Sequence, residues 1–146
     1  MKVSLPDANV LVALMWPSHL HHQRARQWFD TLGDRPWATC PLTQSGFIRA
    51  SSNPRVVDEA VSPGEAVAHL RKLQELGSHE FGPDDLDFAG ENRIPIDHLM
   101  GHRQVTDAYL LGLSIHRVAQ LVTFDRGIQN LVSPQSIDRH SILLLE

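Results

Sequence analysis

The sequence alternates short apolar segments with longer amphipathic ones, and this alternation constrains the fold more than any other feature. Strands are predicted at 2–6, 37–40, 79–81, 120–124 and 141–145. Helices are predicted at 19–32, 42–51, 63–76 and 106–117, with another near 83–89 and a helical turn at 126–131. Strands separated by helices pair in parallel through right-handed crossovers. Because the length suits about one domain, we expect a single α/β domain over residues 1–146 with a central parallel sheet.

Three aspartates stand where their carboxylates can reach one edge of this sheet. Asp7 follows the first strand, Asp125 follows the strand at 120–124, and Asp107 opens a helix that Thr106 is expected to cap. Open α/β sheets bind ligands beyond the carboxyl ends of their strands. Taken singly, these aspartates could be an N-cap, a helix-dipole partner and a turn residue. The functional hypothesis depends on all three occupying the same edge.

Carboxylates gathered at one edge are costly to ionise together unless a cation joins them. We therefore expect Mg²⁺, with Mn²⁺ able to substitute, held first by Asp7 and Asp107 and then by Asp125. Such a metal polarises a phosphoryl oxygen and activates water, so hydrolysis of a phosphodiester is the natural reaction.

Five further side chains are candidates for binding the substrate. The hydroxyls of Ser45, Thr106 and Thr123 could orient the scissile phosphate. Arg49 and Arg126 could bind phosphate oxygens, which the guanidinium group matches in geometry. Ordinary roles as caps, strand residues or surface ion-pair partners remain open for all five.

Composition says more about the cellular location of the protein than about its function. The formal net charge of −4 is not the basic footprint of most nucleic-acid-binding proteins, so a polynucleotide substrate would need metal ions and local arginines to offset repulsion. No apolar run approaches a membrane span, and no secretory signal is recognisable, so we expect a cytoplasmic protein without membrane attachment. The single cysteine, Cys40, is expected to be a small buried residue.

With these residues in place, the sequence resembles a PIN domain, and in particular the VapC toxins of bacterial toxin–antitoxin pairs. The resemblance covers nearly the whole chain. It is carried, in order along the chain, by residues 5–14, 28–29, 46–54, 101–110 and 121–127.

The resemblance implies a three-layer α/β/α fold with a parallel sheet of about five strands. It also implies Mg²⁺-dependent endoribonuclease activity, a homodimer and inhibition by a cognate antitoxin. PIN domains usually carry four acidic residues, and Asp7, Asp107 and Asp125 match the first, third and fourth. Gly46 stands where the second is expected. Either fewer carboxylates hold the metal, with Gln44 or Ser45 assisting through water, or metal binding is weakened.

Other functions remain to be weighed against a ribonuclease toxin. A PIN-like module that binds RNA or protein with weak or no catalysis is the main alternative. Zinc binding by histidines at 19–22 or by His98 and His102 has little support, because no glutamate is placed as in the HExxH motif. A receiver-like phosphoryl-transfer domain fits poorly, because no lysine follows Lys72.

Overall fold

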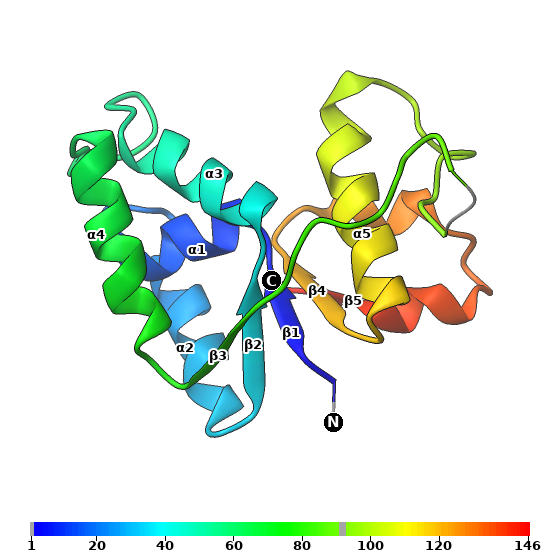
Figure 1. The fold of residues 1–146 in the computed structure, drawn as a ribbon, viewed down its shortest axis with the longest axis horizontal. Helices are drawn as coiled ribbons and strands as arrows, with labels where there is room; N and C mark the ends of the chain where they lie inside the picture. Colours follow the sequence, from blue (N-terminus) through cyan, green and yellow to red (C-terminus); the bar gives the residue numbers. More distant parts are fainter. Residues whose placement is uncertain (1, 91–92) are drawn as a thin grey trace.

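The computed structural model describes residues 2–90 and 93–146. Five strands form one sheet in the order β3-β2-β1-β4-β5, and all neighbouring strands are parallel (Figure 1). All five predicted strands are therefore confirmed, with small shifts at their ends. They are β1 (Ser4–Pro6), β2 (Pro36–Thr39), β3 (Ser78–Phe81), β4 (Gln120–Thr123) and β5 (Ile142–Leu144).

Helices cover both faces of the sheet. Helices α1 to α4 gather on one side, and α5 lies on the other (Figure 1). Their bounds are α1 (Ala8–Met15), α2 (His22–Leu32), α3 (Pro41–Ser51), α4 (Pro63–Gln74) and α5 (Val105–His116). Three short 3₁₀ helices accompany α5, namely η1 (His102–Gln104), η2 (Arg126–Leu131) and η3 (Ile137–Ser141). No helix in the described part of the chain is both long and apolar enough to cross a membrane.

The sheet separates two apolar clusters, because alternate residues of a strand point to opposite faces. Trp37 and Val122 pack with α1, α2 and α4 in the first cluster. Leu5 and Leu121 pack with α5 in the second. These paired clusters make the three-layer α/β/α arrangement that the family resemblance implies.

Strands β1 and β4 lie side by side, as the hypothesis of an acidic edge requires. Pro6 pairs with Val122, and the backbone N–H of Asp7 extends the ladder by donating to the Val122 carbonyl at 3.0 Å. The chain passes from β1 to β2 and β3 in one direction and then returns to place β4 on the other side of β1. Asp7 and Asp125 therefore leave the sheet at its switch point, where open α/β sheets bind ligands.

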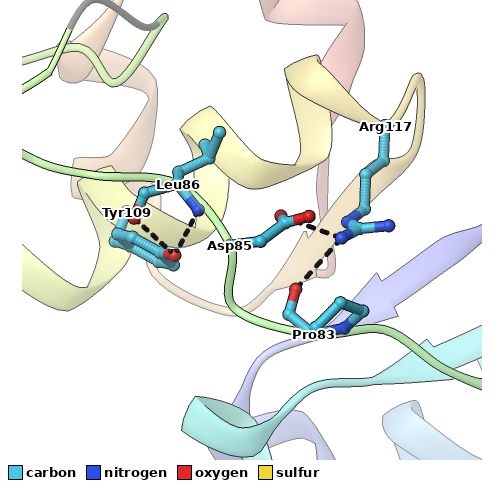
Figure 2. Close-up of polar contacts among 5 residues, drawn as sticks. All are labelled: Pro83, Asp85, Leu86, Tyr109 and Arg117. Carbon is cyan, nitrogen blue, oxygen red and sulfur yellow. Dashed lines mark hydrogen bonds and ion pairs between the residues drawn. The ribbon is translucent and has the colours of Figure 1, made fainter.

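The helix predicted near 83–89 is wrong. After β3 the chain runs without helix across α5, and Figure 2 shows how Tyr109 of α5 and Arg117, which follows α5, hold it. The Tyr109 hydroxyl donates to the Leu86 carbonyl and accepts from the Leu86 N–H, both at 3.0 Å. Arg117 forms an ion pair with Asp85 at 2.9 Å. The Leu86 N–H and carbonyl and the Pro83 carbonyl are thus satisfied by tertiary contacts instead of helix hydrogen bonds.

The start of α5 also differs from expectation. The helix begins at Val105 after Gln104, so Thr106 lies within its first turn and does not cap it. Asp107 remains in the first turn, as predicted.

Candidate active site

Asp7 is the most firmly held of the three carboxylates. It caps α1, because its Oδ1 accepts the backbone N–H of Val10 at 2.9 Å, while its Oδ2 accepts the Thr123 hydroxyl at 2.6 Å. The residue is only 8% exposed. Burial raises the pKa of the carboxyl, and the neighbouring Asp125 adds to this, although both hydrogen bonds act the other way. A carboxylate has about four lone-pair sites, so capping the helix leaves acceptor capacity for a cation.

Asp125 is held next to Asp7 by the end of β4. Its backbone N–H donates to Thr123 Oγ1 at 3.0 Å, and its Oδ1 accepts the Gly127 N–H at 2.8 Å. The Thr123 hydroxyl therefore joins the two acidic residues, donating to the side chain of one and accepting from the backbone of the other. The side chain of Asp125 itself is exposed.

Asp107 approaches the other two carboxylates from the first turn of α5. Partial burial, together with the charges of Asp7 and Asp125 and a hydrogen bond with Asp125, raises its pKa to about 7. The charges of Asp7, near the N-terminus, and of Asp125, in the loop after β4, thus both act on the Asp107 carboxyl. The raised pKa of Asp107 therefore reflects both burial and the proximity of Asp7 and Asp125.

One cleft of about 260 Å³ brings these side chains together at the carboxyl edge of the sheet. Asp7, Asp107 and Asp125 all line it, together with Arg49 from α3 and Thr106 from α5. The remaining lining residues are Ala8, Asn9, Leu42, Thr43, Gly46 and Leu110. The cleft combines three acidic groups with one guanidinium group, so it can accept a cation and an anion beside each other.

Three of the predicted substrate-binding residues do not line this cleft. Thr123 is fully buried, and its hydroxyl is engaged by Asp7 and Asp125 instead of facing substrate. Ser45 and Arg126 are exposed outside the lining. The geometry therefore supports substrate contact by Arg49 and Thr106, and it gives Thr123 the different role of holding Asp7.

Gly46 lies where α3 packs closely against α1. A Cβ atom added at this glycine would be 2.6 Å from the Cβ of Ala8, a distance that real Cβ atoms do not reach. An acidic side chain therefore cannot replace Gly46 unless the two helices separate. Gln44 does not fill the gap, because its amide donates to Thr39 at 3.0 Å and the residue is not part of the cleft lining.

Sequence reasoning missed Asn9 as a cleft residue. Asn9 lies in the first turn of α1, two positions after Asp7, and lines the cleft. Its side-chain oxygen is 2.9 Å from Nε2 of His19. The spacing from Asp7 was a usable signal, because side chains of a helix's first turn surround the end of the preceding strand. The contact with His19 had no signal in the sequence.

The donor set of the cleft fits a hard divalent cation. Carboxylate oxygens suit Mg²⁺ and Mn²⁺, and a cation would offset both the burial and the neighbouring charges that raise the pKa of Asp107. Among residues 2–90 and 93–146, no three His, Cys, Asp or Glu side chains are arranged to hold an ion by themselves. The fit is therefore to an ion that keeps water and phosphate among its ligands, as Mg²⁺ usually does.

Comparisons with known proteins agree with this arrangement. Residues 4–132 match the PIN domain family, a span that contains all three aspartates. Ribonuclease VapC38 of Mycobacterium tuberculosis is 45% identical over 129 residues, covering 88% of this chain and 89% of the relative. Ribonuclease VapC39 is 38% identical, with coverage of 89% and 94%, and Ribonuclease VapC44 is 36% identical, with coverage of 94% and 96%, both from the same species.

The order of the parallel strands and the acidic residues at the switch point of the sheet are the features of a PIN domain. The chain belongs to the PIN domain family, and among PIN domains it is of the VapC type.

Proposed function

We propose that this protein is a Mg²⁺-dependent endoribonuclease that hydrolyses RNA phosphodiester bonds and acts as the toxin of a toxin–antitoxin pair. The observation that carries the proposal is the convergence of Asp7, Asp107 and Asp125 on one cleft beside Arg49. The relatives named as VapC ribonucleases support RNA as the substrate.

The residues of the cleft have separate proposed roles in binding metal, binding phosphate and holding a proton. Asp7 and Asp107 would hold Mg²⁺ or Mn²⁺, and Asp125 would assist. The bound ion would supply positive charge that stabilises the phosphoryl oxygens and makes water a better nucleophile. Arg49 lines the same cleft and would offer its guanidinium group to the anionic phosphate. Asp107, with a pKa of about 7, can hold or release a proton near neutral pH.

The partners of the proposed toxin follow from the charge of the same cleft. A cognate antitoxin would place a basic segment against the three carboxylates, gaining electrostatic affinity and blocking the RNA site at once. A homodimer remains part of the proposal, and its test is the molar mass of the protein in solution.

The central test is substitution of Asp7 by asparagine. Asp7→Asn should abolish RNA cleavage and relieve growth arrest, because it removes the charge of the most firmly held ligand. Asparagine is also a good N-cap, so α1 should stay capped and the fold should remain intact. Asp34→Asn is the matched control, since Asp34 is exposed and precedes β2, at the amino ends of the strands and away from the cleft. Full cleavage by Asp7→Asn would remove Asp7 from the mechanism.

A second function is favoured by one observation. Gly46 replaces the second acidic residue, and the helix contact at this position excludes an acid. The protein could therefore be a PIN-like module that binds RNA or protein without cutting. Purified protein that binds structured RNA but cleaves none with Mg²⁺ or Mn²⁺ would establish this second function and reject the first.

A further inference from the structure

The loop between α1 and α2 places a histidine against Asn9, a residue that lines the cleft. His19 lies in this loop, and its Nε2 is 2.9 Å from the side-chain oxygen of Asn9. Its other ring nitrogen, Nδ1, accepts the backbone N–H of His21 at 3.0 Å. Both nitrogens of the His19 ring are thus engaged, one by the cleft residue Asn9 and one by its own loop.

These contacts fix the protonation of His19 and the orientation of Asn9. A backbone N–H can only donate, so Nδ1 of His19 must be unprotonated. In a neutral imidazole the proton then lies on Nε2, which donates to Asn9, so the atom facing His19 must be the amide oxygen. Burial and the neighbouring His21 and His22 lower the pKa of His19, which agrees with a neutral ring.

The orientation leaves a donor for the cleft. With its oxygen taken by His19, Asn9 keeps its amide –NH₂ group, which has no hydrogen-bond partner within the described residues. Asn9 is exposed and lines the same cleft as Arg49 and the three carboxylates. An uncharged donor is useful there, because it can bind a phosphate oxygen without competing with a cation for the carboxylates.

The loop that carries His19 is itself anchored beside the acidic edge. The ring of His21 stacks on Phe124 with centroids 4.4 Å apart and an angle of 17°. Phe124 lies between Thr123 and Asp125 in the chain, so the stack ties the loop to the end of β4. The loop that carries His19 is therefore fixed in position relative to Asp125, the residue that follows Phe124.

We propose that Asn9 is an RNA-binding residue that donates its amide N–H to a phosphate oxygen in the cleft, and that His19 is a positioning residue that orients this amide. The inference rests on the proposed ribonuclease function and adds the neutral part of its phosphate site. His19 contacts Asn9 and acts on RNA only through it.

Measurements of RNA binding can distinguish the binding role of Asn9 from the positioning role of His19. The probe is a fluorescein-labelled hairpin oligoribonucleotide with Ca²⁺ in place of Mg²⁺, and the readout is fluorescence anisotropy. Asn9→Ala should weaken binding about tenfold, the size expected for a hydrogen bond to a charged group. His19→Ala leaves the amide in place but free to rotate, so it should weaken binding only about threefold. The control is His116→Ala, an exposed residue at the far end of α5.

The double variant tests whether His19 works through Asn9. Adding His19→Ala to Asn9→Ala should cause no further loss, because there is no amide left to orient. ¹⁵N correlation spectra should show the His19 ring as the Nε2–H tautomer. A fully additive double variant, or the Nδ1–H tautomer, would overturn the role of His19.

The outcome also distinguishes failure of the inference from failure of the proposed function. If the wild-type protein cleaves RNA with Mg²⁺ and Asn9→Ala binds the hairpin as tightly as wild type, the inference on Asn9 is wrong and the ribonuclease function stands. If the wild-type protein neither binds nor cleaves RNA, both are wrong.

Discussion

At the scale of single residues, one aspartate has both a structural and a proposed functional role. Asp7 begins α1 as its N-cap and also faces the cleft, so the two explanations that the sequence left open are compatible. The residue that makes this possible is Thr123, which supports Asp7 from β4 and also accepts the N–H of Asp125. A hydroxyl can do both because it is a donor and an acceptor.

Removing this hydroxyl should therefore affect two carboxylates at once. Thr123→Val keeps the shape of the side chain but leaves Asp7 Oδ2 and the Asp125 N–H without their partner. We expect a loss of about 1–3 kcal/mol in the free energy of unfolding. Cleavage should fall about 10- to 100-fold, as is typical when a residue that orients a metal ligand is removed. Thr123→Ser, which restores the hydroxyl, should recover most of the activity; equal activity of the Val and Ser variants would contradict this role.

The raised pKa of Asp107 predicts how metal binding depends on pH. Because the pKa is about 7 without metal, an ion must displace a proton below that pH. The affinity for Mn²⁺, measured by calorimetry, should therefore fall about tenfold for each pH unit below 7 and level off above it. Asp107→Asn should lose most of the affinity, while Asp34→Asn should match the wild type. An affinity that is constant from pH 5 to pH 8 would show that Asp107 is not a ligand.

At the scale of elements, local patterns predicted what local interactions determine. Ser62 and Glu65, three positions apart at the start of the helix predicted at 63–76, form a capping box that begins α4, with both hydrogen bonds at 3.2 Å. The helix prediction near 83–89 was wrong because the backbone N–H and carbonyl of Leu86 bond to Tyr109 on α5, a partner distant in sequence. The placement of Asp7 and Asp125 at one edge was predictable from strand order, whereas the contact of Asn9 with His19 was not.

The approach of α1 to α3 at Gly46 gives a prediction about both helices. Alanine in a helix interior is more favourable than glycine by roughly 0.8–1 kcal/mol, but overpacking costs about 1–3 kcal/mol. Since the added Cβ would be 2.6 Å from that of Ala8, Gly46→Ala should lower the free energy of unfolding. In an Ala8→Gly background the clash is absent, so the same substitution should instead be stabilising. Denaturant unfolding of the four proteins checks this, and a loss in both backgrounds would reject the packing explanation.

At the scale of the whole molecule, the cleft is made by bringing distant parts of the chain together. Thr123 and Asp7 are 116 positions apart, and the pairing of β1 with β4 joins them. Folding therefore gathers three carboxylates in a protein whose net charge is already −4. The free energy of unfolding is lower for this, because the folded state concentrates negative charge that the unfolded chain disperses. Ligand binding and folding stability should consequently depend on the same groups.

This coupling can be measured as the dependence of stability on pH. The folded-state pKa of Asp107, about 7, lies above its ordinary value of 3.8, so between these values the folded chain holds a proton that the unfolded chain releases. Stability should therefore fall as pH rises through this window and stay level above it, and the raised pKa of Asp7 acts in the same direction.

Asp107→Asn removes a charge that burial and the neighbouring carboxylates disfavour. It should therefore raise the melting temperature by a few degrees at pH 8 without metal, but hardly change it at pH 4, where the wild-type carboxyl is largely protonated in the folded state. Adding Mn²⁺ at pH 8 should raise the melting temperature of the wild type, because a ligand that binds only the folded state stabilises it. The same addition should leave Asp107→Asn almost unchanged. A difference between the two proteins that is equal at pH 4 and pH 8, or a response to Mn²⁺ that survives in Asp107→Asn, would separate the acidic cleft from both stability and metal binding.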